Sequence, residues 1–255
     1  MRLPLRLQSW SAALLIVGLS AIPARSDAQL KLYVANQQGT YQDNTYGGAM
    51  WGTMTSLLDG AFGAGNVSQF ADLNNLATLM TYDRLWLDQR LGGTLSATEY
   101  SNVAAFLATG RRAVLIGEND LWIPWNAQLA SLVGGTITST CDYTSAVPVL
   151  AHAITAGVTS VDPACTSLAS GGTNLFSTGF ATLWGSNLST LLVLDANIQD
   201  DFYGAWADNA TFNANTASWL AASSVTATPE PASLLLVATG LAGVTAVVRR
   251  RRRSA

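Results

Sequence analysis

The sequence has one histidine, two cysteines and few charges, and each shortage removes a class of function. His152 is the only imidazole in 255 residues, so a cluster of histidine metal ligands is excluded. Cys141 and Cys165 are too few for a zinc site, which would need two further ligands. No glycine-rich phosphate-binding loop is present. We therefore expect neither a cofactor nor a metal.

Positive charge is scarce except at the two ends of the chain. Eight of the 13 basic residues are arginines in the first 25 and the last seven residues, which leaves five basic against 14 acidic residues between Gln29 and Thr228. The resulting formal charge of −9 repels nucleic acid, so we expect no nucleic-acid partner. This region of about 200 residues can bury one core, and no repeat or linker divides it.

The most informative stretch is the last 27 residues. Pro229-Glu230-Pro231 is followed by an uncharged, mostly apolar run (232–248) and then by Arg249, Arg250, Arg251, Arg252 and Arg253. At about 1.5 Å per residue, this run would span roughly 25 Å as a helix, near the short end of what crosses a bilayer core. The arginines predict that the carboxyl end stays in the cytoplasm while the preceding domain lies outside. A buried core helix with a solvated basic tail is the alternative.

These three parts, in this order, resemble the PEP-CTERM sorting signal of bacterial exported proteins. The resemblance implies that an exosortase, a membrane protease, recognises Pro229, Glu230 and Pro231 and passes the protein to the cell surface. It also implies a setting of extracellular polysaccharide production. The expected partners are thus the exosortase, the secretion machinery, the membrane before processing, and extracellular polysaccharide. A plain membrane anchor after a proline-rich linker is the alternative.

The amino end has the pattern of a secretory signal peptide. Arg2 and Arg6 precede a largely apolar run (10–23), and Ser26-Asp27-Ala28 offers small residues before a cut, with cleavage after Ala24 as the alternative. We expect a signal peptide (1–28), a central α/β domain (29–222), a linker with the Pro-Glu-Pro motif (223–231), a transmembrane helix (232–248) and a basic cytoplasmic tail (249–255). The protein would then pass through an inner-membrane intermediate to the outer surface or the extracellular matrix.

Export also bears on the two cysteines. An isolated pair in an oxidising compartment is typical of a disulfide, so we predict a bond between Cys141 and Cys165. Two buried free thiols are the alternative.

Apolar periodicity predicts that strands and helices alternate through the central domain. The predicted strands are 30–35, 66–70, 82–87, 113–117, 135–140 and 189–194, and the predicted helices are 49–58, 73–79, 96–107, 125–132 and 209–222. The clearest helix start is the capping box of Ser96 and Glu99, and Gly110 ends the same helix. This order indicates an α/β sheet with right-handed crossovers.

Four stretches (94–99, 110–117, 194–197 and 208–220) resemble the class I glutamine amidotransferase-like fold. The resemblance implies a single flavodoxin-like domain with a mostly parallel sheet flanked by helices. It implies no activity, because Glu118-Asn119-Asp120 stands where those enzymes carry a cysteine nucleophile. Those enzymes also carry a His-x-Glu pair, whereas His152 is followed by Ala153 and Ile154. The sequence contains no Gly-x-Ser-x-Gly nucleophile elbow either. We therefore assign no catalytic residue.

Polar residues that follow buried strands are the candidate site. Glu118, Asn119 and Asp120 follow one strand and Asp195 another, which is where open α/β sheets bind ligands, and His152 is a candidate for the same crevice. The acidic residues Asp195, Asp200, Asp201 and Asp208 could bind calcium, but their spacing is not that of an EF-hand, and a solvated acidic loop is the alternative.

Tryptophan is abundant, and most of these side chains are expected to be core or crevice lining. We predict that Trp122 and Trp125, beside the Glu118 turn, are exposed and stack on sugar rings. Two functions stay open. The first is a non-enzymatic structural or interaction component of the extracellular matrix. The second is an exported hydrolase-like or ligand-binding enzyme that uses acidic residues or His152 at the strand ends.

Overall fold

Short runs of buried aliphatic residues form the centre of a seven-stranded sheet. The computed structural model describes residues 30–35, 43–63, 65–70, 72–90 and 93–222. The predicted signal peptide, Pro-Glu-Pro linker, apolar run and arginine tail lie outside these residues. Among the described residues, no helix combines the length and the apolar character that crossing a membrane requires.

The main sheet has the order β2-β1-β3-β4-β9-β8-β7. Its strands are β1 (Leu32–Ala35), β2 (Val67–Phe70), β3 (Arg84–Leu87), β4 (Ala113–Ile116), β7 (Thr173–Asn174), β8 (Ala181–Trp184) and β9 (Thr190–Val193). The five strands from β2 to β9 in this order are parallel, whereas β8 and β7 pair antiparallel at one edge. The parallel part has the 2-1-3-4-5 order of flavodoxin-like sheets, and the prediction of a mostly parallel sheet flanked by helices is confirmed.

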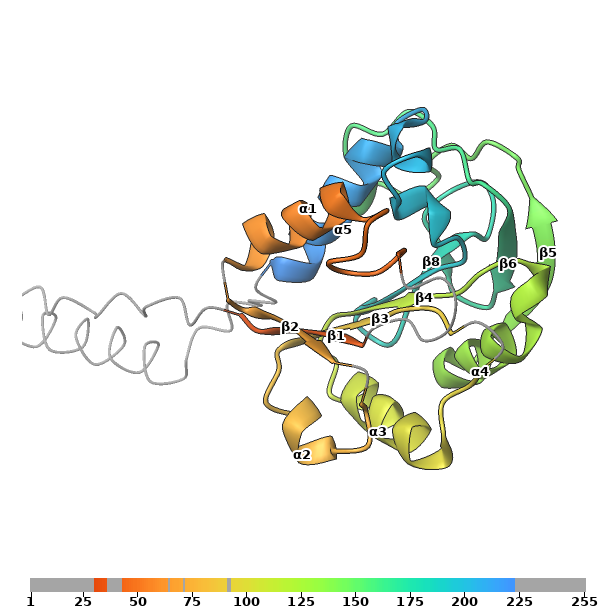
Figure 1. Cartoon of the computed structure of the whole chain (residues 1–255). Helices are drawn as coiled ribbons and strands as arrows, with labels where there is room; N and C mark the ends of the chain where they lie inside the picture. The colour runs from red at the N-terminus through yellow and green to blue at the C-terminus, as the bar shows by residue number, and fades with distance from the viewer. Residues whose placement is uncertain (1–29, 36–42, 64, 71, 91–92, 223–255) are drawn as a thin grey trace, which may run out of the picture.

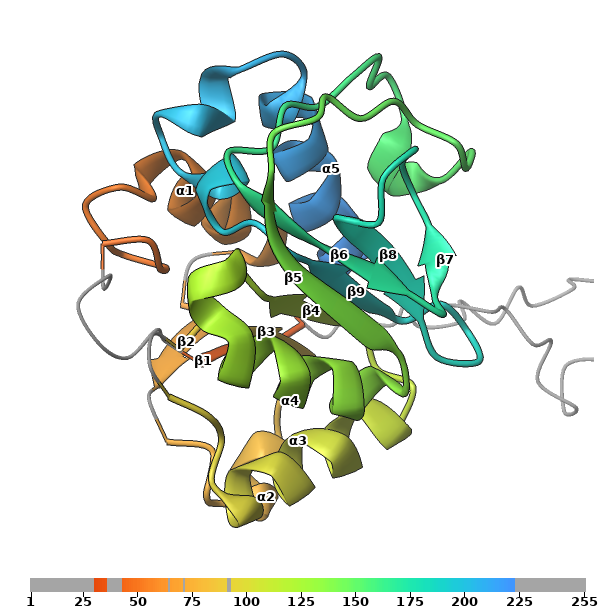
Figure 2. The same cartoon turned by 90° about the vertical axis from the view of Figure 1, so that its right-hand side faces the viewer.

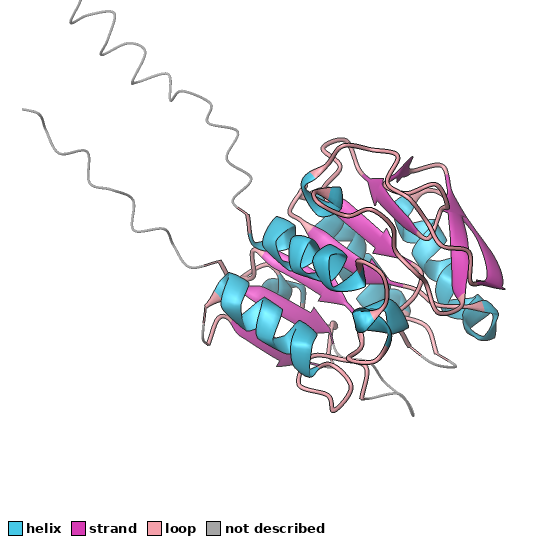
Figure 3. Ribbon diagram, turned by 90° about the horizontal axis from the view of Figure 1, so that it is seen from above, coloured by secondary structure: helices cyan, strands magenta, loops and turns pink. Residues whose placement is uncertain are grey.

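Helices cover both faces of this sheet (Figure 1). On one face α1 (Gly52–Phe62) and α5 (Asn209–Ala221) lie side by side, as the view from above also shows (Figure 3). The other face carries α2 (Leu76–Leu79), α3 (Ala97–Ala108) and α4 (Ile123–Val133). Short 3-10 turns are η1 (Asp120–Trp122), η2 (Ala153–Thr155), η3 (Asn197–Gln199) and η4 (Tyr203–Ala205).

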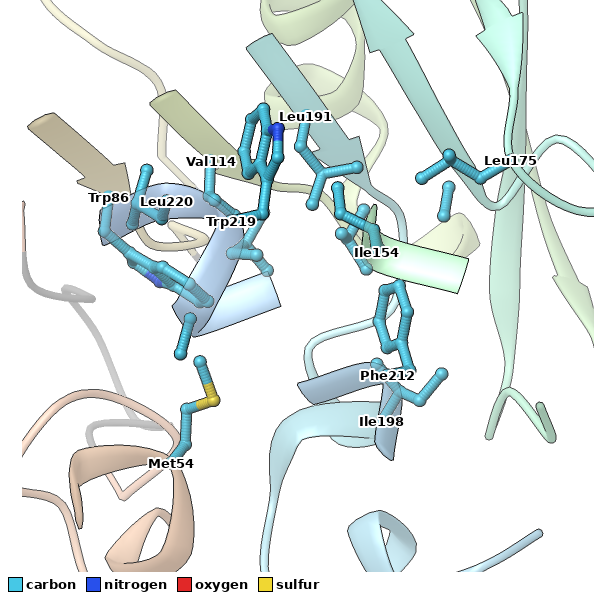
Figure 4. Packing of buried hydrophobic residues seen from close by; sticks show 14 of the residues in the cluster. Met54, Trp86, Val114, Ile154, Leu175, Leu191, Ile198, Phe212, Trp219 and Leu220 are labelled. Carbon is cyan, nitrogen blue, oxygen red and sulfur yellow. The ribbon is translucent and has the colours of Figure 1, made fainter. Parts of the chain in front are cut away.

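The pleat of each strand divides its side chains between two hydrophobic clusters. In β4, Val114 and Ile116 join the cluster under α1 and α5, while Ala113 and Leu115 join the cluster over α3 and α4. Figure 4 shows the first cluster, in which Trp86 of β3 lies near Met54 of α1. Because both faces of the central strands are covered, these strands are continuous apolar runs in the sequence.

The helix boundaries depend on local capping and on distant contacts. The capping box of Ser96 and Glu99 at the start of α3 is confirmed. The start of α1 at Gly52 is later than predicted, because its first N–H groups are satisfied from far along the chain. The Asp201 carboxylate accepts from Gly52 N and Thr53 N, each at 2.9 Å.

Two arginines hold the end of α5 at the amino-terminal edge of the sheet. Arg84 Nε donates to the Leu220 carbonyl at 2.7 Å, and Arg84 Nη2 donates to the Ala222 carbonyl at 3.0 Å. Arg112 Nη1, at the start of β4, donates to the same Ala222 carbonyl at 2.7 Å. Cationic groups at a helix carboxyl end satisfy its free carbonyls and oppose its dipole. The last described residues are therefore fixed beside the starts of β3 and β4.

A second, two-stranded sheet lies beside α4, near the carboxyl ends of the parallel strands of the main sheet (Figure 2). Its strands β5 (Thr136–Asp142) and β6 (Thr166–Ser170) pair antiparallel, with an irregular register between Thr138 and Asp142. Cys141 and Cys165 form a disulfide beside this irregularity, so the predicted bond is confirmed. Strands β6, β7 and β8 were not predicted from the sequence.

Removing the disulfide is expected to lower the free energy of unfolding by about 3 kcal/mol, because the bond closes a loop of intermediate length in the unfolded chain. The variant Cys141→Ala/Cys165→Ala, unfolded in urea next to the wild type, measures this loss. The reduced wild type serves as a control and is expected to match the variant. A variant as stable as the oxidised wild type would contradict the expectation.

Candidate functional site

The carboxyl ends of the parallel strands meet at one edge of the sheet, and polar residues follow each of them. Gln89 follows β3, Glu118 and Asn119 follow β4, and Asn197 follows β9. Asn44 belongs to the connection between β1 and α1. The connection from β1 crosses one face of the sheet and that from β3 crosses the other face (Figure 1). A ligand crevice is expected at such a switch point.

Two cavities open at this edge, and they share Asn44 and Asn197. The Glu118 cavity, of about 150 Å³, is lined by Asn44, Gln89, Glu118, Asn119, Leu121, Trp122 and Asn197. The Phe202 cavity, of about 300 Å³, is lined by Asp43, Asn44, Met50, Asn197, Asp200, Phe202 and Tyr203. We refer to the two together as the switch-point groove. Carboxamide side chains recur along it, beside aromatic rings.

Glu118 and Asp195 are buried and link the loops after β4 and β9. Glu118 Oε1 accepts from Ala196 N at 3.0 Å, and Glu118 Oε2 accepts from Asn119 N and Asn119 Nδ2, each at 2.9 Å. Asp195 Oδ1 accepts from Asn197 N at 3.0 Å and Asp195 Oδ2 from Ala164 N at 2.5 Å. Every carboxyl oxygen of the pair therefore receives an N–H group, and the pair fixes the shape of the groove.

Burial raises the pKa of both carboxyl groups. The pKa of Glu118 lies well above its ordinary value of 4.5 because the side chain is removed from water and because the charge of Asp195 is close by. The pKa of Asp195 is raised first by burial, against the effect of the backbone N–H donors at Ala164, Asn197 and Ile198. The folded protein therefore holds protons here that the unfolded chain releases.

This shift predicts a stability that falls as the pH rises above about 4.5, the ordinary pKa of glutamate. In that range the unfolded chain has lost the Glu118 proton while the folded protein still binds it, so each pH increment favours unfolding. Urea unfolding of the wild type and of Glu118→Gln across pH 4.5 to 8 measures the effect. The stability difference between the two proteins cancels groups that do not interact with Glu118, such as His152, and reports on the interacting Glu118 and Asp195 carboxyl groups. It is expected to shift in favour of Glu118→Gln with rising pH. A difference that is constant with pH would contradict it.

Gln89 has an unusual place in the groove. Its side chain is 1% exposed, its Nε2 lies 3.5 Å from the Asn44 carbonyl oxygen, and its Oε1 finds no hydrogen-bond partner within the described part of the chain. A buried acceptor without a partner costs about 1–3 kcal/mol. Gln89 lines the Glu118 cavity, but its Oε1 has almost no exposed surface, so a donor group of a ligand bound there could satisfy this oxygen only after the side chain rotates.

Asn126 of α4 supports the turn after β4. Its Oδ1 accepts from Glu118 N at 3.0 Å, and its Nδ2 donates to the Glu118 carbonyl at 2.7 Å. The side chain is wholly buried. Sequence reasoning missed Asn126, Gln89 and Asn44, because a lone amide carries no motif, although Gln89 is the second residue after a predicted strand.

The structure brings some of the predicted site residues together and separates others. Glu118, Asn119 and Asp195 meet at the carboxyl edge, and Asp120 is exposed at the start of η1 beside them. His152 is not there. Its Nδ1 accepts from Ile154 N at 3.2 Å, and its ring packs 6.3 Å from that of Trp219.

The contacts of Trp219 show at which end of the sheet His152 lies. Arg112, which precedes β4, stacks over the Trp219 ring at 5.2 Å, whereas Glu118 follows β4. His152 therefore lies toward the opposite edge of the sheet from the groove. Burial lowers the pKa of His152, which favours its neutral form.

The predicted exposure of Trp122 and Trp125 is wrong. Trp125 is 1% exposed, and its Nε1 donates to the Ile116 carbonyl at 2.7 Å. Trp122 is also buried, although it lines the Glu118 cavity. Both indoles, Trp122 from η1 and Trp125 from α4, belong to the hydrophobic cluster on the α3 and α4 face of the sheet. The aromatic side chains exposed near the groove are instead Phe202 and Trp206.

The acidic residues after β9 bind backbone N–H groups. Asp201 caps α1, and Asp208 Oδ2 accepts from Thr159 N at 2.7 Å. Asp200 Oδ1 accepts from Phe202 N at 2.9 Å and Tyr203 N at 2.6 Å. Across the described ranges, no three histidine, cysteine or acidic side chains are grouped so that they could hold a metal ion. Asp200, Asp201 and Asp208 each stabilise the local backbone by accepting its N–H groups, which gives a structural reason for the acidic residues that follow β9.

Comparisons with known proteins concern the tail and the domain separately. Residues 227–253 match the PEP-CTERM protein-sorting motif, which confirms the predicted resemblance. This motif marks an exported protein that an exosortase processes and that is sorted to the cell surface. No characterised protein sequence matches the chain.

Solved structures are similar to the domain at low sequence identity. The N-terminal domain of mmIFT52 has a TM-score of 0.59 at 12% identity, over 77% of this chain and 99% of that one. A ThuA-like protein from Bacteroides uniformis has a TM-score of 0.51 at 10% identity, over 75% of this chain and 91% of that one. A GMP synthase protein from Thermoplasma acidophilum has a TM-score of 0.49 at 12% identity, over 75% and 96%. The first two similarities, with the strand order, confirm the flavodoxin-like fold and carry no activity.

Proposed function

We propose that this exported, exosortase-sorted protein is a non-enzymatic component of the cell surface and that it binds extracellular polysaccharide through the switch-point groove. The matched motif at 227–253 supports the sorting step. The observation that carries the binding step is the lining of the groove, where Asn44, Gln89 and Asn197 lie beside aromatic rings. Carboxamides pair with hydroxyl groups, and ring faces pack against the apolar face of a sugar. In this proposal residues 1–28 are the signal peptide, and residues 29–222 are the domain that binds the polysaccharide. Residues 232–248 anchor the protein in the membrane until the linker 223–231 is cleaved.

The chemistry of the groove supports binding over catalysis. The one imidazole of the chain, His152, lies away from the groove, so no histidine base can activate a nucleophile there. Glu118 and Asp195 use their oxygens to accept backbone and side-chain N–H groups. A carboxyl group that is held in this way positions the loops around a ligand.

One observation favours the second candidate function, an exported hydrolase. The raised pKa of Glu118 keeps a protonated carboxyl group in a cavity, which is the state that a general acid needs at neutral pH. Purified protein incubated with cell-surface polysaccharide separates the two functions by the release of new reducing ends. Release that disappears in Glu118→Gln would establish the hydrolase and overturn the binding proposal.

Replacing Glu230 with Ala is expected to abolish processing of the tail, because the exosortase is proposed to recognise the charged residue between the two prolines. The mature protein is sized by immunoblot, and its surface-exposed fraction is measured, in the native host. The expected result is one larger, membrane-retained species for Glu230→Ala. The same species is expected for the wild type in a strain without exosortase.

Thr226→Ala is the matched control, because Thr226 lies just outside the matched residues 227–253. This variant is expected to be processed like the wild type. Unaltered size and surface exposure of Glu230→Ala would refute the sorting step.

A further inference from the structure

Three aromatic rings pack against one another at the rim of the groove. They come from Phe202, Tyr203 and Trp206, in the connection between β9 and α5. The ring centroids are 4.9 Å apart for Phe202 and Tyr203, 4.6 Å for Tyr203 and Trp206, and 5.9 Å for Phe202 and Trp206. Phe202 is 59% exposed and Trp206 is 40% exposed. We call these three residues the aromatic platform.

Hydrogen bonds fix the backbone that carries the platform. Asp200 Oδ1 accepts from the N–H groups of Phe202 and Tyr203, and the Asp200 carbonyl accepts from Gly204 N at 2.8 Å. Asn209 Nδ2, from the start of α5, donates to the Tyr203 carbonyl at 2.8 Å. Exposed rings on a fixed backbone lose little conformational entropy when a ligand packs on them. The platform is thus preorganised for binding.

The platform adjoins polar groups that can bind hydroxyls. Phe202 and Tyr203 line the Phe202 cavity together with Asn44, Asn197 and Asp43. Its volume of about 300 Å³ is at the lower end of small-molecule sites. Asn44 and Asn197 continue into the Glu118 cavity, where the buried Oε1 of Gln89 lacks a partner among the described residues. This oxygen has almost no exposed surface, so a ligand that reaches from the platform to Gln89 would supply the missing donor once the side chain rotates toward the cavity.

These groups indicate which ligands fit. A pyranose ring offers an apolar C–H face for an aromatic ring and hydroxyl groups for carboxamides and carboxylates. Asp43 and Asp200 would repel a uronate or a sulfated sugar, as would the charge of the domain. A wholly apolar ligand would leave the Gln89 oxygen unsatisfied. A neutral polysaccharide meets all three conditions.

We infer that the aromatic platform and the adjoining groove bind a neutral pyranose unit of a polysaccharide, with the sugar face on Phe202 and Trp206. In this inference the Gln89 side chain rotates toward the Glu118 cavity, and a sugar hydroxyl donates to its Oε1. This inference rests on the proposed function and names its ligand class.

Affinity electrophoresis of the mature domain tests the inference, with galactomannan, xyloglucan and dextran as neutral probes and alginate as the acidic probe. We expect retention by a neutral probe and none by alginate. Phe202→Ala and Trp206→Ala are each expected to weaken retention about three- to tenfold, since each removes one ring–sugar contact. Tyr143→Ala is the matched control, because Tyr143 is 64% exposed and lines neither cavity. It is expected to be retained like the wild type.

Gln89→Met separates a ligand contact from a merely structural side chain. This variant is expected to weaken retention about threefold while its thermal midpoint stays equal to that of the wild type or rises, because the unpaired buried oxygen is gone. Equal retention of Phe202→Ala, Trp206→Ala and the wild type overturns the inference and leaves polysaccharide binding in place. Retention by alginate alone overturns the neutral ligand class, and a wild type retained by no polysaccharide overturns both the inference and the proposed function.

Discussion

Replacing Arg90 with Met is expected to lower the free energy of unfolding by about 3–5 kcal/mol, the usual cost of removing one partner of a buried ion pair. Arg90 Nη1 and Nη2 lie 3.1 and 2.9 Å from the two oxygens of Glu99, and both side chains are more than 90% buried. Glu99 Oε2 also accepts from Ser96 N at 2.8 Å in the capping box of α3. Without Arg90, a buried carboxylate would remain at the start of that helix.

The double variant Arg90→Met/Glu99→Gln tests whether the uncompensated charge causes the loss. It is expected to regain a large part of the stability in urea unfolding at pH 7, because the charge and its partner are removed together. The folded-state pKa of Glu99 is lowered: burial opposes this shift, but the Arg90 and Ser96 hydrogen bonds outweigh it. The wild-type pair therefore contributes stability above about pH 4.5 that is lost as the pH falls further. A double variant as unstable as Arg90→Met would rule out this cause.

The second large loss is expected for Trp86→Ala, at about 3–5 kcal/mol of unfolding free energy. Trp86 is fully buried in β3 and packs edge-on against Trp51 with ring centroids 5.6 Å apart (Figure 4 shows Trp86 in its cluster). Its Nε1 donates to Asp88 Oδ1 at 2.7 Å, and Thr45 Oγ1 donates to Asp88 Oδ2. Truncation would leave a cavity in the core and remove a donor from Asp88.

Trp86→Phe distinguishes the cavity from the lost hydrogen bond. Phenylalanine keeps most of the ring volume, so Trp86→Phe is expected to lower the free energy of unfolding by only about 1–3 kcal/mol. Most of this loss would come from the missing hydrogen bond to the Asp88 carboxylate. Thermal and urea unfolding of both variants give the comparison. Because Asp88 holds Thr45 next to Asn44, both variants are also expected to weaken ligand binding in the groove. Equal losses for Ala and Phe would show that the hydrogen bond, and not packing, dominates.

Features set by neighbours in the chain were predictable, whereas those set by tertiary contacts were not. The capping box of Ser96 and Glu99 lies within one turn, and the sequence predicts it correctly. The partner Arg90 is nine residues away from Glu99, and only the folded loop brings it near. The central parallel strands are continuous apolar runs, but β6 and β7 are rich in Ser and Thr and depend on antiparallel pairing for their identity.

The candidate site shows the same division. Parallel strands end at one edge, so the meeting of Glu118 with Asp195 followed from two strand ends in the sequence. The exposure of a tryptophan depends on which side of a helix faces the sheet, and the predicted exposure of Trp122 and Trp125 was wrong for that reason. Phe202 and Trp206 lie in a loop without periodicity, where the sequence offers no signal for exposure.

The attachment of α5 has a mechanical consequence. The last described residue, Ala222, is held by Arg84 and Arg112 at the amino-terminal edge of β3 and β4, whereas the groove lies at the carboxyl ends of those strands. A tensile load applied through the chain beyond Ala222 would first stretch these guanidinium–carbonyl bonds. Beyond these bonds the load would run along α5, whose first residue Asn209 holds the Tyr203 carbonyl of the aromatic platform. The anchor at Ala222 therefore protects the platform from a pull on the chain that follows.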